Sequence, residues 1–332
     1  MTERLKLLHE WLDRELGLTG YTLAPASEDA SFRRYFRVSR AAESMIVMDA
    51  PPDKEDCRPY IEITGRLLAC RVNVPRIRAC DPDRGFLLLD DLGTKLYLYS
   101  LTEDSSDRLY ADAVKALLQI QAKASVDGLR GYDATLLQEE MTLFRDWLLE
   151  QHLQLNNTWQ KLLDESFALL EQAALEQPQV FVHRDYHSRN LLVTEQHNPG
   201  IVDFQDALKG PLTYDAVSLF KDCYIKWPRS QVIKRALDYR RQACAYLGID
   251  VSEQQFLRWF DLMGVQRQLK ASGIFTRLCH RDGKAGFLQD IPRTLSYILE
   301  LEGEYPELRP LIALLREHVL PGLEHTHIPC AQ

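Results

Sequence analysis

The chain has 332 residues, of which 45% are hydrophobic and 27% charged, so it is long enough to bury a substantial core. Its formal net charge is -8 and no run of Lys and Arg stands out, which argues against a nucleic-acid partner. No apolar run reaches membrane-spanning length, and the first residues are typical of an amphipathic helix, so we expect a cytoplasmic protein without a signal peptide or membrane partner.

The N-terminal part of the sequence predicts a small β-sheet. After the first helix, the segments YTLAP, FRRYFRVS and SMIVMDA are rich in aromatic and β-branched residues, as strands are. We expect a helix near 58–70, where Pro59 is tolerated in the first turn, followed by RIRAC and GFLLLDD as two more strands. The sequence changes character at 90–94, which indicates a hinge.

Helical periodicity dominates the remainder. It marks segments 104–125, 135–153, 158–176, 213–226, 230–247, 252–275 and 290–320. The sequence therefore predicts an α+β protein of two lobes. The smaller one, residues 1–92, would hold an antiparallel β-sheet and one main helix, and the larger one, residues 93–332, would be mostly α-helical.

A polar loop between two apolar runs carries the chemistry. His183, Asp185 and Asn190 follow the order H-x-D-x-x-x-x-N, and Asp203 begins a D-F pair after the second run. In phosphoryl transfer, a carboxylate accepts the proton of the acceptor hydroxyl, while an amide and a second carboxylate hold Mg²⁺ against the phosphates. We therefore expect ATP and Mg²⁺ as cofactors, Asp185 as base, and Asn190 and Asp203 as metal ligands. His183 is expected to hold the loop by hydrogen bonds.

The motifs HRDYHSRNLLV and IVDFQDALKGPLTYDAVSL resemble the aminoglycoside phosphotransferase family, a branch of the protein-kinase-like fold that acts on small molecules. The resemblance covers most of the chain and implies the same roles for Asp185, Asn190 and Asp203. It also implies that Asp215 is a buried carboxylate that orients the loop, although an aspartate that begins a helix would look the same. Only eleven residues separate Asp203 from Asp215, which disfavours a long activation segment and a peptide substrate.

The nucleotide site departs from the kinase pattern in two ways. The segment SEDASFRRYFRV replaces the glycine-rich turn, and the third strand ends in Met48 and Asp49 where a lysine is expected. Arg33, Arg34 or Lys54 could contact phosphate instead, with Glu62 as a partner, but each is also typical of a surface charge. The residues assigned to nucleotide binding are Ser27, Ala30, Ser31, Phe32, Arg33, Asp90, Asp91 and Leu92.

A closer likeness concerns the substrate. The segments SFRRYFRV, VMDAPPDKED, FLLLDDLG and GVQRQLKASGIFTRL are similar to bacterial cell-wall amino-sugar kinases that phosphorylate N-acetylmuramate and N-acetylglucosamine at the anomeric hydroxyl. The likeness implies ATP-dependent formation of a sugar 1-phosphate in peptidoglycan recycling. Candidate sugar contacts, each also typical of a solvated face, are His187, Gln205, Asp206, Tyr224, Arg267 and Lys270.

Two other functions stay open. One is a kinase of the same fold that acts on an aminoglycoside, a choline-like alcohol or another small acceptor. The other is a pseudokinase binding module, against which the presence of all three catalytic residues argues. The sequence does not indicate an oligomeric state. Its seven cysteines form no C-x-x-C pair, so we expect free thiols and no structural metal.

Overall fold

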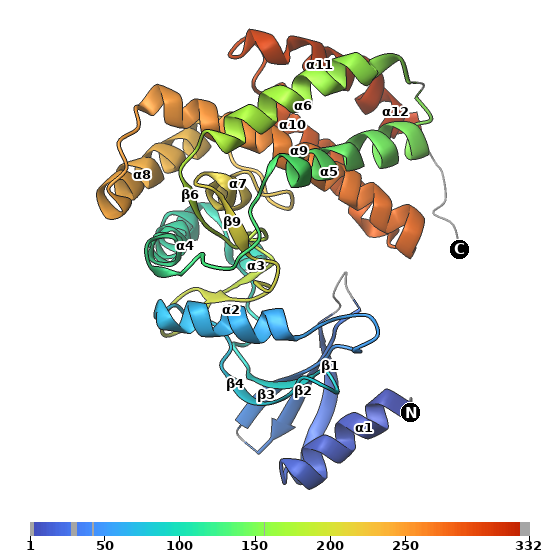
Figure 1. The fold of residues 1–332 in the computed structure, drawn as a ribbon, viewed down its shortest axis with the longest axis vertical. Helices are drawn as coiled ribbons and strands as arrows, with labels where there is room; N and C mark the ends of the chain where they lie inside the picture. Colours follow the sequence, from blue (N-terminus) through green and yellow to red (C-terminus); the bar gives the residue numbers. More distant parts are fainter. Residues whose placement is uncertain (1–2, 28–31, 42, 156, 326–332) are drawn as a thin grey trace. The chain divides into compact units, whose positions relative to one another are not determined.

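The computed structural model describes residues 3–27, 32–41, 43–155 and 157–325. The chain divides into two compact units. The first comprises Met1–Ser105 with Asn190–Asp206, and the second comprises Ser106–Arg189 with Ala207–Gln332. One boundary therefore falls inside the H-x-D-x-x-x-x-N motif, just before Asn190. In Figure 1 the strands of the N-terminal sheet are blue to cyan and the C-terminal helices are orange to red.

A five-stranded antiparallel sheet forms the first unit, in the order β1-β2-β3-β5-β4. Its strands are β1 (Thr22–Ser27), β2 (Arg34–Arg40), β3 (Glu43–Asp49), β4 (Ile77–Asp81) and β5 (Phe86–Asp90). These strands occur where the aromatic and β-branched segments predict them, and the antiparallel pairing is confirmed. Neighbouring residues of a strand point to opposite faces, so the alternating apolar positions of β3 and β5 build one apolar surface.

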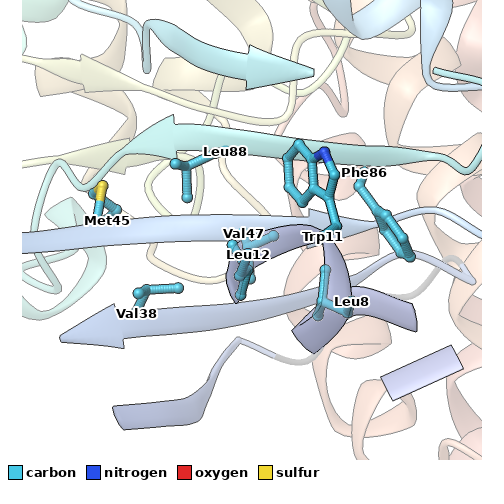
Figure 2. Close-up of a cluster of buried hydrophobic side chains, with 8 residues drawn as sticks. All are labelled: Leu8, Trp11, Leu12, Val38, Met45, Val47, Phe86 and Leu88. Atoms are coloured by element: carbon cyan, nitrogen blue, oxygen red, sulfur yellow. The ribbon is translucent and has the colours of Figure 1, made fainter. Parts of the chain in front are cut away.

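The N-terminal helical segment packs on that surface. It consists of α1 (Glu3–Glu10) and the π-helical turn η1 (Trp11–Glu15). The ring of Trp11 lies 5.6 Å from the ring of Phe86 on β5. Figure 2 shows the buried cluster that results, made of Leu8, Trp11, Leu12, Val38, Met45, Val47, Phe86 and Leu88. Its burial fixes the helical segment to the sheet, because removing apolar area from water stabilises the contact.

The segment Asn190–Asp206 adds a second, small sheet to the first unit. Its strands are β7 (Leu191–Leu192) and β8 (Gly200–Ile201), which pair antiparallel. The other helices of this unit are α2 (Arg58–Ala69) and the short α3 (Tyr97–Ser100). The ring of Tyr60 on α2 packs 4.8 Å from the ring of Phe204, which directly follows Asp203. The helix therefore supports the D-F pair.

Helices dominate the rest of the described chain. A two-stranded antiparallel sheet, β6 (Gln179–Val182) with β9 (Leu208–Pro211), lies among them. The α-helices are α4 (Glu103–Lys123), α5 (Ala134–Leu143), α6 (Gln160–Leu175), α7 (Tyr214–Phe220), α8 (Arg229–Leu247), α9 (Glu253–Asp282), α10 (Ile291–Leu299), α11 (Arg309–Leu314) and α12 (Leu320–His325). Shorter helical segments are η2 (Phe144–His152), η3 (Asn157–Trp159), η4 (Ala285–Asp290), η5 (Pro306–Leu308) and η6 (Leu315–Val319).

The longest helix, α9, is the centre of the second unit. It packs against α5, α6, α7 and α10 (Figure 1). Ser252 caps its start by accepting a hydrogen bond from the Gln255 N–H at 3.1 Å, and Gly283 ends it with a φ of 69°. A Cβ at Gly273 would lie 2.3 Å from the Leu143 carbonyl carbon, so glycine permits the close approach to α5. Polar residues of α9, among them Gln266, Arg267 and Lys270, are buried.

One helix expectation needs correction. The helix expected over 213–226 ends at Phe220, because Asp222 turns inward and accepts backbone hydrogen bonds from Ser188 and Tyr224 at 2.9 and 2.8 Å. The segment 290–320, expected to be helical with an interruption at Pro306, forms α10, α11 and shorter helical segments, with Pro306 at the start of η5.

Cysteine and membrane expectations can also be compared with the described residues. Cys279 is disulfide-bonded, so the expectation of free thiols is wrong for this residue, whereas five cysteines are free: Cys57, Cys70, Cys80, Cys223 and Cys244. Within the described ranges, no helix combines the length and the apolar character needed to cross a membrane.

Candidate active site

A buried aspartate holds the backbone of the loop after β6 by hydrogen bonds. Asp215, near the start of α7, accepts hydrogen bonds from the backbone N–H groups of His183 and Arg184 at 2.7 and 3.1 Å. Arg184 has a φ of 77°, a conformation that is strained for a residue with a side chain. Its carbonyl accepts a hydrogen bond from Arg267 on α9 at 2.8 Å. Both sides of the strained residue therefore have a buried partner, which fixes the backbone that leads to Asp185.

Burial and hydrogen bonding oppose each other at Asp215. Burial raises the pKa of Asp215 to about 7, and the two backbone N–H groups offset only part of that effect. The residue is completely buried, as the family resemblance implies. This geometry matches an orienting carboxylate, while the role itself stays a prediction.

Positive charges surround Asp185. Burial by itself raises the pKa of Asp185, but its interactions with Lys270, His187, Arg267 and Arg184 bring it below the ordinary value. The carboxylate is therefore ionised near neutral pH. A general base needs this form, because only the ionised carboxylate can accept a proton.

Two of the cations near Asp185 are themselves held by Glu140 of α5. Glu140 forms ion pairs with Arg184 and with Lys270, the latter at 2.8 Å, and accepts a hydrogen bond from Tyr132. Burial raises the pKa of Glu140, yet the two cations bring it down to about 2. Lys270 also donates to the Tyr214 hydroxyl at 3.0 Å. The network fixes the basic side chains in the interior.

His183 lies inside the loop. It is fully buried, and its Nδ1 accepts a hydrogen bond from the Asp185 N–H at 3.3 Å. Its ring lies 5.5 Å from the ring of Tyr186, edge to face. An Nδ1 that accepts a backbone N–H belongs to a neutral imidazole. We therefore keep the prediction that His183 positions the loop.

The expected metal ligands lie together within the first unit. The Asn190 amide nitrogen donates to one oxygen of Asp203 at 3.1 Å, and the Gln205 amide nitrogen donates to the other at 2.9 Å. The Gln205 carbonyl oxygen is buried without a hydrogen-bond partner among the described residues. Asp203 has a φ of 63°, so a second strained residue stands at the site. Amide and carboxylate oxygens fit Mg²⁺.

No group of three His, Cys, Asp or Glu side chains suited to a metal occurs in the described ranges. The expected magnesium ligands are an amide and a carboxylate, Asn190 and Asp203, and they stay a prediction. Mg²⁺ usually keeps several waters, because it gives them up reluctantly.

Arg33 is the basic residue associated with this acidic group. Glu55 pairs with the Arg33 guanidinium at 3.1 Å and accepts the Phe32 N–H at 3.2 Å. Burial lowers the pKa of Arg33, but Tyr35 and the carboxylates of Glu55, Asp206 and Asp203 raise it above the ordinary value. Arg33 therefore stands in the electric field of the expected metal ligand.

The other candidates for the missing strand lysine have different surroundings. Asp49 is fully buried and forms ion pairs with Arg4 and Arg34, so Arg34 neutralises a core carboxylate. Lys54 lies 5.9 Å from the centre of the Phe32 ring. Glu62, the expected helix partner, pairs instead with Arg66 one turn along α2.

The remaining nucleotide-site predictions are less well defined by the structure. Ala30 and Ser31 lie outside the described residues, and so does the side chain of Ser27, whose backbone ends β1. The carboxylate of Asp90 pairs with Arg78, and that of Asp91 pairs with Arg37 and accepts from Ser44. The carboxylates of Asp90 and Asp91 thus have partners within the protein, and contacts of Asp90, Asp91 and Leu92 with a nucleotide stay a prediction.

The predicted substrate residues fall into two groups. Within the second unit, Arg267 and Lys270 lower the pKa of Asp185 by their positive charge. The centre of the His187 ring lies 5.4 Å from the centre of the Tyr224 ring. Gln205 and Asp206 lie beside Asp203 in the first unit, and Gln205 donates to Asp206 at 3.3 Å. The assignment of both groups to sugar binding stays a prediction.

The architecture and the motif are matched by a known family. The model of the phosphotransferase enzyme family matches residues 22–254, which include both strained loops and Asp215. The chain belongs to the phosphotransferase enzyme family. It therefore is an ATP-dependent kinase, as the motif predicts.

Named relatives of this phosphotransferase share much of its sequence. One, from Pseudomonas putida, is 45% identical over 331 residues, which cover 95% of this chain and 96% of the relative. Another, from Pseudomonas aeruginosa, is 48% identical over 301 residues and covers 88% of this chain and 87% of the relative. Both are named N-acetylmuramate/N-acetylglucosamine kinase.

A solved structure supports the fold. An aminoglycoside phosphotransferase with bound ADP aligns with a TM-score of 0.58 at 14% identity, over 88% of this chain and 97% of its own. The predicted kinase-like fold, with an N-terminal antiparallel sheet and a mostly helical remainder, is confirmed. At this level of identity the likeness carries no information about the acceptor.

Sequence reasoning missed several residues of the phosphotransferase site. Glu140 and Tyr132 lie more than 40 positions before the motif and carry no local signal. Asp222 was also missed, since it lies in a segment expected to be helical. Arg184 and Arg189 are inside the motif, so their position alone could have marked them.

Proposed function

We propose that this phosphotransferase is a cell-wall amino-sugar kinase. It transfers the γ-phosphoryl group of ATP to the anomeric hydroxyl of N-acetylmuramate or N-acetylglucosamine, giving the sugar 1-phosphate for peptidoglycan recycling. The observation that carries the acceptor is the name shared by two relatives of 45% and 48% identity along most of the chain. The anomeric position rests on the likeness of the sequence and on the chemistry of this hydroxyl.

The proposed reaction fits the environment of Asp185. An anomeric hydroxyl is more acidic than an ordinary alcohol, so a carboxylate base of low pKa has a smaller gap to cross. Asp185 accepts this proton as the new bond from the sugar oxygen to the γ-phosphorus forms. The bond between that phosphorus and the β,γ-bridging oxygen breaks, and ADP leaves.

On the donor side, Asn190 and Asp203 would hold Mg²⁺, which neutralises charge on the phosphates. Arg33, supported by Glu55, is proposed to contact phosphate in place of the absent strand lysine. A guanidinium suits this role, because its planar N–H groups can bind two oxygens of a phosphate at once.

The alternatives are less well supported. A cationic aminoglycoside or choline-like acceptor would meet Arg184, Arg267 and Lys270 around the base, and like charges disfavour its approach. A pseudokinase would not need Asp185, Asn190 and Asp203 together with two strained loops that carry them.

Phosphorus NMR of the purified protein with Mg-ATP and each sugar tests the proposal. We expect a new phosphate signal coupled to the anomeric proton for at least one sugar. A phosphate coupled elsewhere on the ring would contradict the anomeric assignment. Phosphorylation of a choline-like or aminoglycoside acceptor, with neither sugar converted, would replace the proposed acceptor.

A further inference from the structure

Arg189 differs from the other basic residues of the catalytic loop. Its guanidinium lies 3.7 Å from the centre of the Tyr224 ring and 5.7 Å from that of Phe287. Within the described part of the chain, no carboxylate pairs with Arg189 and no group accepts a hydrogen bond from it. Its side chain is half-buried. Five N–H donors are therefore held between aromatic surfaces and remain available to a ligand.

The neighbouring cations do not share this property. Arg184 and Lys270 both pair with the buried carboxylate of Glu140. Arg267 donates to the Arg184 carbonyl. A ligand anion that bound to any of these three would disturb the support of the loop, whereas an anion on Arg189 would not.

The surface beneath Arg189 is built as a rigid platform. Asp222, buried at 2% exposure, accepts the N–H of Ser188 at 2.9 Å and the N–H of Tyr224 at 2.8 Å. It thus ties the catalytic loop to the segment that carries the Tyr224 ring. From α10, Tyr297 donates to the Asp222 carbonyl at 3.2 Å, which supports this segment from behind. The position of Arg189 is therefore fixed before a ligand arrives.

The platform also lies close to the base. The ring of His187 is 5.4 Å from that of Tyr224. Burial raises the pKa of Tyr224, the charge of Asp185 adds to the rise, and Arg189 opposes it. Asp185 and Arg189 are four positions apart on one loop. A sugar with its anomeric oxygen at Asp185 would place its ring substituents near this platform.

The two proposed sugars differ in one charged group. N-acetylmuramate carries a lactyl ether that ends in a carboxylate, and N-acetylglucosamine has a hydroxyl in its place. We infer that Arg189, stacked on Tyr224 and Phe287, binds this lactyl carboxylate and sets the preference between the two sugars. The inference rests on the proposed function, because it requires an amino-sugar acceptor. A planar guanidinium can bind both carboxylate oxygens at once.

The test compares three acceptors: N-acetylmuramate, its neutral lactyl carboxamide, and N-acetylglucosamine. For the wild-type protein, we expect the carboxamide to have a kcat/KM about 10- to 100-fold below that of N-acetylmuramate. Arg189→Met should lower kcat/KM for N-acetylmuramate by a similar factor, mainly through KM, and should process the acid and the carboxamide alike. For N-acetylmuramate, the kcat/KM of Arg189→Lys should lie between those of the wild type and Arg189→Met, because lysine keeps the charge and loses the planar pair of donors.

Two comparisons separate binding of the carboxylate from a structural role. A structural role would lower kcat/KM for all three acceptors by the same factor in Arg189→Met, and this result would overturn the inference. So would a wild-type protein that treats the acid and the carboxamide equally. Arg241→Met is the control for the loss of an arginine, since this residue of α8 is exposed and pairs with Asp238.

Failure of the proposed function gives a different pattern. Activity on N-acetylglucosamine without any advantage for the lactyl carboxylate would overturn the role of Arg189 alone. Absence of phosphorylation of all three acceptors by the wild-type protein would overturn both proposals.

Discussion

The two halves of the candidate site, residues 183–189 and residues 190–206, lie in opposite electrostatic surroundings. In residues 183–189, Asp185, the proposed base, is surrounded by Arg184, Arg267 and Lys270. In residues 190–206, Asp203 is hydrogen-bonded by two amides and lies in a group of acids that includes Asp206, with Arg33 nearby. The difference corresponds to two tasks. The first half keeps a carboxylate ionised, and the second half has the oxygen atoms that we propose bind Mg²⁺.

The two halves share one structural device. Each contains a residue with side chain and positive φ, 77° at Arg184 and 63° at Asp203. Such conformations cost free energy and persist only where surrounding contacts enforce them. At Arg184 these contacts come from Asp215 and Arg267, and the Phe204 ring after Asp203 is packed on Tyr60. Strain at both positions supports a functional reason for the backbone geometry.

The largest predicted effect belongs to the base. Asp185→Asn removes the proton acceptor but leaves the metal half intact, so turnover should fall by about 10²- to 10⁴-fold while Mg-ATP binding stays nearly unchanged. Steady-state kinetics and calorimetric nucleotide binding measure the two quantities separately. Turnover close to that of the wild type would exclude Asp185 as base.

The metal half should respond differently. Asp203→Ala removes a ligand for Mg²⁺, so both Mg-ATP affinity and turnover should fall, turnover by about 10²-fold. A titration of activity with magnesium measures the change, and Glu195→Ala, an exposed position between β7 and β8, is the matched control. An unaltered magnesium dependence in Asp203→Ala would remove Asp203 from the ligand set.

A smaller effect is expected at Arg33. Arg33→Met removes the proposed phosphate contact, so KM for ATP should rise by about tenfold. Lys54→Met should leave this KM nearly unchanged, because Lys54 lies over the Phe32 ring. Equal effects of the two substitutions, measured by initial rates over a range of ATP concentrations, would argue against a specific contact by Arg33.

Much of this architecture could be predicted from local patterns. The five strands follow aromatic and β-branched runs, and α4, α8 and the beginning of α9 follow the helical periodicity. The H-x-D-x-x-x-x-N motif also marks Asp185 and Asn190 as candidate site residues, and the D-F pair that follows it marks Asp203. These features depend on residues close together along the chain.

The supports of the site could not be predicted in the same way. Glu140 is 44 positions from Arg184, and Asp222 is 34 positions from Ser188. Such pairs form because buried charges and N–H groups need partners, and sequence spacing does not show which partner meets which. The sequence shows Asp49 where a kinase strand carries a lysine. The ion pairs of Asp49 with Arg4 and Arg34, however, depend on the packing of α1 on the sheet.

The smallest predicted effect is in the pH dependence of the base half. Because the pKa of Asp185 is lowered, its contribution to stability is present above the unfolded pKa and is lost as pH falls through the lower folded value. The ionised base is thus present throughout the neutral range, so with N-acetylglucosamine, which has no carboxylate, titration of Asp185 itself should change kcat/KM by less than about twofold between about pH 6.5 and about pH 8.

A pH profile can also separate Asp185 from Asp215. Burial raises the pKa of Asp215 to about 7, so protonation of this residue falls inside the measured range. An acid limb near that pH that disappears in Asp215→Asn would assign pH control to the support of the loop. An acid limb that persists in Asp215→Asn would exclude Asp215 as the titrating group. It would also contradict the prediction that neighbouring cations keep Asp185 ionised in this pH range.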